Sequence, residues 1–228
     1  MKKLYDKNLV KNLYSNNYPS YNTLLEFLKE DDFEQKHFAM TFISTLEKPS
    51  DIEFFIANVV DQDTKIRELA SFKIADFISE NESLMGFLDA KPDIILRTIC
   101  DVNPQVCRNI CSLLPKSKNK NYLREQLLIK IQDLCEATKS IRTKTHKVSK
   151  DLFNLYWSFY ALEYLIDKNF EKNFELQAII KDCLEYKDYT IRERVAFLSK
   201  KLNFQDAEIK NKILSDENFY VRKVLEIN

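Results

Sequence analysis

The stretch that decides the fold is Asp63–Ala70, which reads DTKIRELA, because the chain repeats its pattern several times. Each copy begins with Asp or Asn and carries a β-branched residue three positions later. Arg usually follows, and a small or apolar residue takes the eighth position. The other clear copies are Asn103–Ile110 (NPQVCRNI), Asp188–Val195 (DYTIRERV) and Asn218–Leu225 (NFYVRKVL). A motif that recurs along a chain in this way indicates repeated supersecondary units.

Two weaker copies complete the series. Asp32–Ala39 keeps the capping residue, a basic fifth residue and a small eighth residue, and Thr138–Arg142 keeps the Ile-Arg pair. The fifth positions of the six copies are then residues 36, 67, 107, 142, 192 and 222. Helical repeats have periods of roughly 30 to 50 residues, which fits these intervals. The sequence therefore predicts five or six stacked helix pairs.

Composition and periodicity favour the same all-α class. The chain of 228 residues has one glycine, Gly86, whereas sheet proteins need glycine at their tight turns. Its five prolines fall where helices should begin or end. Apolar residues recur every three or four positions, as in the stripe Ile66, Leu69, Ala70, Ile74. The longest apolar stretch, Leu152–Ile166, is too short and too polar for a membrane span and predicts a buried helix.

The pattern D-x-x-[IV]-R-x-x-[AV] at the start of a helix resembles the HEAT repeat family. Asp63–Ala70 and Asp188–Val195 match it most closely, and Asn103–Ile110 departs from it by placing Cys107 where Arg is expected. The resemblance covers most of residues 20–228. It implies a right-handed, armadillo-like α-α superhelix (an α-solenoid) forming a single domain over residues 1–228. Residues 1–18 would form an N-terminal capping helix, and residues 19–228 the stacked repeats.

The repeated arginine needs a partner that the helix itself does not provide. Asp or Asn at the cap accepts hydrogen bonds from the first-turn N–H groups, but the helix dipole would prefer an acidic residue at the arginine's position. If the repeats stack, an Asp of the neighbouring repeat can bind each arginine and form a ladder of charge-assisted bonds. We predict a structural ladder rather than ligand-binding arginines. Its residues are Asp63, Arg67, Asp188, Arg192 and Arg222.

No catalytic or cofactor-binding pattern is recognisable in the chain. Nucleotide-binding and hydrolase motifs are absent, and the two histidines, His37 and His146, have no nucleophile at a motif spacing. Cys107 and Cys111 lie one helical turn apart and could share a metal, but free cysteines commonly fill helix cores. We expect no metal, no cofactor and no enzymatic activity. The aromatic run from Tyr156 to Tyr164 fits a buried helix better than a base-stacking platform, with Trp157 as the likeliest exception.

Charge is balanced overall but concentrated in one segment. Residues 116–150 hold ten basic and three acidic residues, a net charge of +7 in a chain whose 35 basic and 35 acidic residues cancel. This segment is either a solvated helix face or a contact for an anionic partner. If it is helical, Lys139, Arg142, His146 and Lys150 fall on one side. The candidate anion-binding residues are Lys139, Arg142, Lys144, His146, Lys147 and Lys150.

Two functions remain open at this point. The HEAT resemblance implies a non-enzymatic scaffold that binds another macromolecule, most simply a protein. The alternative is a nucleic-acid-binding protein related to the alkylpurine DNA glycosylases of DNA alkylation repair, whose repeat starts Asn218–Lys223 resembles. That family uses an acidic residue and tryptophans in a basic groove, whereas this chain has Trp157 alone and no Asp that can be matched. Free cysteines and no signal peptide favour a cytoplasmic protein with no membrane contact. Its oligomeric state is left open.

Overall fold

The computed structural model describes residues 18–145, 147, 149–167 and 174–226. Over these residues the protein contains thirteen α-helices, four short 3-10 helices and no strand. The predicted all-α class is therefore confirmed. The chain divides into two compact units, residues 1–118 and residues 119–228, and each is described by itself.

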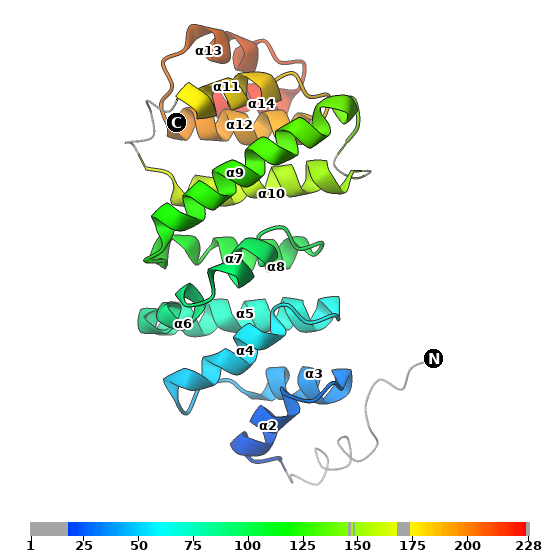
Figure 1. Ribbon diagram of the computed structural model, residues 1–228, viewed down its shortest axis with the longest axis vertical. Helices are drawn as coiled ribbons and strands as arrows, with labels where there is room; N and C mark the ends of the chain where they lie inside the picture. The colour runs from blue at the N-terminus through cyan, green and yellow to red at the C-terminus, as the bar shows by residue number, and fades with distance from the viewer. Residues whose placement is uncertain (1–17, 146, 148, 168–173, 227–228) are drawn as a thin grey trace. The chain divides into compact units, whose positions relative to one another are not determined.

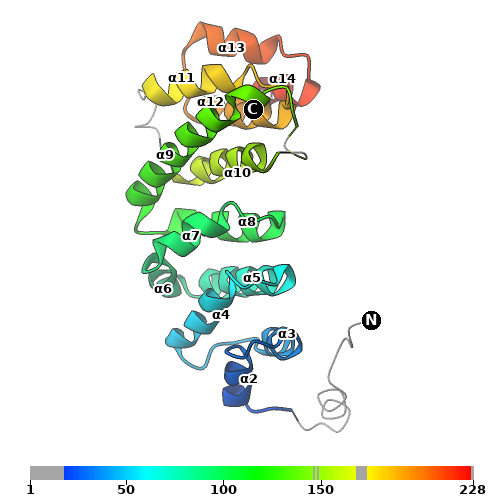
Figure 2. The ribbon, with the colours of Figure 1, turned by 45° about the vertical axis from the view of Figure 1, so that its right-hand side comes forward.

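The first unit contains three pairs of helices that pack against each other (Figure 1). Within this unit the second helices α3, α5 and α8 also pack against one another in sequence, and both ribbon views show them as successive layers (Figure 2). The pairs are α2 (Tyr21–Phe27) with α3 (Phe33–Phe42), α4 (Ile52–Asn58) with α5 (Thr64–Glu80), and α7 (Pro92–Thr98) with α8 (Pro104–Cys111). The short α6 (Met85–Asp89) and two 3-10 helices (Pro49–Asp51 and Glu82–Leu84) lie between these pairs, and a third 3-10 helix, Leu114–Lys116, follows α8.

The second unit repeats this plan. Helices α9 and α10 pack together, and α10, α12 and α14 then pack in sequence, as the second helices of the first unit do. The pairs are α9 (Lys120–Thr138) with α10 (Lys150–Leu165), α11 (Phe174–Cys183) with α12 (Tyr189–Lys201), and α13 (Ala207–Leu214) with α14 (Phe219–Glu226). A 3-10 helix, Lys139–Ile141, follows α9 directly. Three pairs in each unit agree with the predicted number of five or six.

The predicted caps are present at the start of five second helices, and at the first of them, α3, Asp32 accepts the Gln35 N–H. Asp63 accepts N–H bonds from Lys65 and Ile66, and Asn103 and Asp188 each accept one from the residue two positions later. The Asn218 side chain likewise accepts the Tyr220 N–H. These bonds satisfy N–H groups that have no partner within the helix. The repeated motif therefore marks the first turn of a second helix in these five copies.

The predicted fourth copy, Thr138–Arg142, is wrong. These residues form the end of α9 and the following 3-10 helix, rather than the start of a second helix. The Thr138 hydroxyl donates to the carbonyls of Leu134 and Cys135 one turn back, so it does not cap a new helix. The second helix of this pair, α10, instead begins after Ser149, whose hydroxyl accepts the Leu152 N–H.

Burial follows the helical stripes. In the first unit Ile66, Ala70 and Ile74 of α5 are completely buried, as their spacing predicts. In the second unit α10 supplies Leu152, Leu155, Phe159 and Leu162 to one cluster with α11 and α12. Burial of this apolar surface is the main term that holds each unit together. No helix in the described part of the chain is long and apolar enough to cross a membrane.

Candidate functional site

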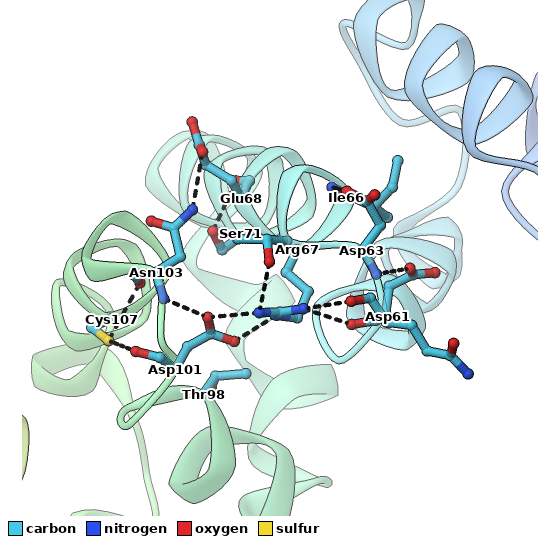
Figure 3. A network of polar contacts seen from close by, with 12 residues as sticks. Asp61, Asp63, Ile66, Arg67, Glu68, Ser71, Thr98, Asp101, Asn103 and Cys107 are labelled. Carbon is cyan, nitrogen blue, oxygen red and sulfur yellow. Dashed lines mark hydrogen bonds and ion pairs between the residues drawn. The ribbon is translucent and has the colours of Figure 1, made fainter. Parts of the chain in front are cut away.

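The junction between α5 and α8 is built around one arginine (Figure 3). Arg67 donates through Nε and Nη2 to the two carboxylate oxygens of Asp101, at 2.6 and 3.0 Å. Its Nη1 donates to the backbone carbonyls of Asp61 and Gln62, both at 3.0 Å. Two parallel bonds to one carboxylate give both strength and a fixed orientation. Arg67 thus joins the loop before its own helix to the loop before the next second helix.

The junction between α12 and α14 has the same design. Arg192 donates through Nε and Nη2 to Asp216 at 2.7 and 3.0 Å, and its Nη1 donates to the carbonyls of Tyr186 and Lys187. The side chains of Arg192 and Asp216 are only 6% and 7% exposed. Because both charges are withdrawn from water, removal of either partner leaves the other buried and unpaired. Arg192 is therefore a structural residue of the second unit.

The acid of each ladder contact is a residue that the sequence analysis missed. The cap residues Asp63 and Asp188 accept bonds from their own helices, and the arginines pair instead with an acid two positions before the next cap. In the first unit Lys36 pairs with Asp61 in the same way, at 2.5 Å. We call the three contacts the charge ladder: Lys36–Asp61, Arg67–Asp101 and Arg192–Asp216.

Each ladder acid also accepts a backbone hydrogen bond, which explains why it lies two positions before the cap. The carboxylates of Asp61, Asp101 and Asp216 each accept the backbone N–H of the following cap residue, all at 2.8 Å. One aspartate thus holds the loop and receives the basic side chain of the preceding repeat. The spacing Asp-x-Asp or Asp-x-Asn was visible in the sequence, so this signal could have identified the ladder acids.

Cys107 replaces the arginine in the third copy and takes over part of its role. Its Sγ contacts the carbonyl oxygen of Asp101 at 3.1 Å, a residue six positions earlier in the chain. The arginines at the equivalent positions bind the carbonyls six residues before them. Burial raises the pKa of the Cys107 thiol, so the group stays protonated and able to donate. At this position a neutral thiol therefore replaces the arginine as the donor to the carbonyl of the preceding loop.

The pKa values of the first unit's junction fit a structural role. The hydrogen bond that Arg67 donates to Asp101 raises the pKa of Arg67 and outweighs the opposing effect of burial. Hydrogen bonds from Lys65 and Asn103 lower the pKa of Glu68, which lies beside Arg67 on the same turn. Both groups are thereby held in their charged forms. None of these shifts brings a group toward neutral pH, where acid–base catalysis would need it.

The predicted basic face does not exist as one helix side. Lys139 begins the 3-10 helix Lys139–Ile141, Arg142 follows that helix, and Lys150 is the first residue of α10, so these three residues do not share a helix. Arg142 pairs with Asp182 and lies over the Tyr186 ring, with its Cζ atom 5.3 Å from the ring centre. Lys139 pairs with Glu136. His146 lies outside the described residues.

Three lysines after the 3-10 helix, the last of them in the first turn of α10, have exposed side chains. Lys144, Lys147 and Lys150 are exposed, and none forms an ion pair with another residue in the described part of the chain. The sequence grouped them with Arg142, which is half-buried and engaged within the second unit. Of the predicted anion-binding residues that the structure describes, these three lysines and Lys139 are exposed, whereas Arg142 is half-buried.

Four of the five cysteines are buried, as expected for residues that fill the core, and Cys100 is half-buried. Cys107 and Cys111 are both buried, and no group of three or more potential metal ligands occurs among the residues that the structure describes. In the second unit the sulfur atoms of Cys135 and Cys183 lie 3.7 Å apart within the buried cluster. Burial raises the pKa of the Cys183 thiol well above its usual value, which disfavours the reactive thiolate.

The Trp157 side chain is 3% exposed, so its indole is not presented as a stacking surface. It contacts Phe153, Tyr156 and Tyr160 on the same helix. We expect blue-shifted emission from the native protein and slow quenching by acrylamide, with rapid quenching after denaturation. Quenching of the native protein as fast as that of the denatured chain would contradict this burial.

The raised pKa of Tyr186 predicts that the protein loses stability at alkaline pH. Burial raises its pKa from 10.0 to about 12, against the opposing hydrogen bond with Thr138. The folded state therefore keeps a proton that the unfolded state has lost, and this contribution is complete below pH 10 and lost as the pH rises toward 12. Denaturant titrations of wild type and Tyr186→Phe across this range should show a shallower alkaline decline for the variant. Equal declines would contradict the assignment.

Tyr21 supplies the same test for the first unit. Burial raises its pKa to about 12, while the Glu47 N–H that it accepts works in the opposite direction. Tyr21 donates its hydroxyl to Asp51 at 2.9 Å. A Tyr21→Phe variant should therefore also show a shallower alkaline decline than wild type, and a decline equal to that of wild type would contradict the raised pKa of Tyr21.

Comparison with known proteins adds no identification. No protein-family model matches the chain, and a search of curated proteins finds no similar sequence. Function must therefore be argued from the geometry of the helix pairs and the surfaces they expose.

Proposed function

We propose that this chain is a non-enzymatic helical-repeat module, similar to HEAT repeats, that binds another protein. The observation that carries the proposal is the charge ladder. The repeat arginines Arg67 and Arg192 each donate hydrogen bonds to an aspartate of one loop and to backbone carbonyls of another. This arrangement fits a scaffold in which repeated charges hold neighbouring helix pairs together. Repeat proteins of this kind present extended surfaces and need no catalytic residues. A cytoplasmic location is part of the same proposal.

The surface that supports a protein partner is an aromatic cluster on α12 and α14, formed by Tyr189, Phe219 and Tyr220. These side chains are 40%, 53% and 58% exposed. The Tyr189 and Tyr220 rings stack with centres 6.2 Å apart, and Phe219 meets Tyr220 edge-on at 5.6 Å. Exposed, contiguous aromatic groups often mark protein contacts, and tyrosine is enriched among the residues that dominate binding energy.

The test compares matched variants in one capture experiment. Purified wild type, a Tyr189→Ser/Tyr220→Ser variant and a Tyr122→Ser control are each exposed to a nuclease-treated native extract. Tyr122 is a comparably exposed tyrosine on α9, at 44%. We expect one discrete protein to bind wild type and control but not the double variant, and to bind purified wild type directly. Equal retention by all three would contradict this surface.

A second candidate, nucleic-acid binding, rests on the exposed lysines Lys144, Lys147 and Lys150. A phosphate backbone would release counterions when it binds them, so affinity should fall steeply with salt. Against the glycosylase form of this candidate stand the buried Trp157 and the internal ion pair of Arg142.

Heparin and duplex DNA retention at low salt decides this second candidate. Replacing Lys144, Lys147 and Lys150 with Glu should abolish retention without changing the helical circular dichroism signal, because none of them pairs with a described residue. No retention of wild type would eliminate the nucleic-acid candidate.

A further inference from the structure

On α14, Arg222 occupies the position that Arg67 and Arg192 occupy on their helices, but it lacks their carboxylate partner among the described residues. Arg222 donates through Nη1 to the carbonyls of Asp216 and Glu217, as Arg67 and Arg192 do with their own preceding loops. In those two junctions the Nε and Nη2 edge then receives an aspartate. Arg222 forms no ion pair with any residue in the described part of the chain. Its guanidinium is therefore already oriented by its loop toward an acid from elsewhere.

In the first unit, an acid at the corresponding position before a cap has no basic partner among the described residues. Asp32 caps α3, and Glu30 stands two positions before it, where Asp61, Asp101 and Asp216 stand before their caps. Glu30 and Asp32 are exposed, and neither forms an ion pair within the residues that the structure describes. We call these two residues the acidic corner of the first unit.

A second contact of the α5–α8 junction also has a counterpart with opposite charges. At the α5–α8 junction, Glu68 lies five positions after its cap and accepts a bond from the next cap, Asn103, at 3.0 Å. The equivalent residues are Lys223, five positions after Asn218, and the cap Asp32. An exposed lysine would there meet an exposed carboxylate. Both contacts of the α5–α8 junction thus have counterparts in which opposite charges would meet. These counterparts are Arg222 with Glu30 and Lys223 with Asp32.

The side of α14 that would be covered is also less buried than its counterpart. Arg192 and Val195 of α12 are buried beneath the following helix pair, whereas the equivalent Arg222 and Leu225 of α14 are half-buried. We call Arg222, Lys223 and Leu225 the open face of α14. A further helix pair docked there would bury the same apolar and charged positions that are already buried at Arg192.

We propose that the open face of α14 binds the acidic corner of a second copy of this chain, head to tail. The contact uses two different surfaces of each molecule, so it is heterologous and leaves one surface free on each member of a dimer. Junction geometry and charge support this contact independently of the protein partner proposed above. The contact would be sensitive to salt because its charges lie at the surface.

Sedimentation velocity of the full chain over a wide range of protein concentration, at low salt, tests the proposal. Wild type should self-associate with rising concentration, whereas Arg222→Glu and Glu30→Arg should each weaken association by about tenfold or more. Mixing the two single variants should restore it, since each then offers the charge that the other needs. Lys144→Glu, which makes the same change of charge away from both surfaces, should behave like wild type.

Glu30→Arg keeps the experiment decisive if Arg222→Glu disturbs the α13–α14 loop, because Glu30 is exposed. A wild type that remains monomeric at every concentration would overturn the proposal. Self-association that both charge reversals leave unchanged, or that the mixture fails to restore, would overturn the assigned surfaces.

Discussion

Replacing Arg192 with alanine is expected to lower the free energy of unfolding by about 3 kcal/mol, because it breaks a buried ion pair. The variant leaves the Asp216 carboxylate, 7% exposed, without its bidentate partner. It also removes the donors to the Tyr186 and Lys187 carbonyls. Urea denaturation followed by circular dichroism measures the effect directly.

Arg222→Ala is the matched control for this prediction. Arg222 makes the same type of contact with two carbonyls of its preceding loop but has no acidic partner among the described residues. Its replacement should cost about 1 kcal/mol, the contribution of ordinary hydrogen bonds. The comparison is made at a protein concentration where the chain is monomeric. Equal losses for the two variants would show that the acid contributes nothing to the ladder.

Replacing Arg67 with alanine is expected to destabilise the first unit by about 2 to 3 kcal/mol. The expected loss is slightly smaller than at Arg192, because the side chains of Arg67 and Asp101 are 11% and 10% exposed and water can reach the vacated site more easily. Thermal unfolding should show a lower melting temperature, while partner binding measured well below that temperature remains. An unchanged melting temperature together with lost binding would make Arg67 a binding residue and reverse its assignment.

Much of the fold was predictable because it depends on local signals. The Asp or Asn caps, the boundary prolines and the three-and-four spacing of apolar residues locate helix starts and buried stripes without long-range information. The fourth copy failed because an Ile-Arg pair alone does not distinguish the end of α9 from the start of a second helix. Ser149, which does cap α10, lacked the following arginine that the repeat pattern required.

The candidate sites were less predictable because they depend on which loops meet. The sequence identified Arg67 and Arg192 as structural but did not name Asp101 or Asp216, which lie 34 and 24 residues away. Arg142 looked like part of a cationic surface, yet it binds Asp182, 40 residues later. Net charge along a segment cannot reveal such pairing. Lys139 lies in a 3-10 helix and Lys150 begins α10, so the basic residues do not share one helix face.

A double-mutant cycle on Arg67 and Asp101 tests the central claim that repeats are joined by a charge ladder. The free energy of unfolding is measured for wild type, Arg67→Ala, Asp101→Ala and the double variant, and the coupling energy is taken from the four values. The ladder predicts a favourable coupling of about 1 to 3 kcal/mol, since the two groups form a bidentate, largely buried pair. A coupling near zero, with the two single losses simply adding, would contradict it.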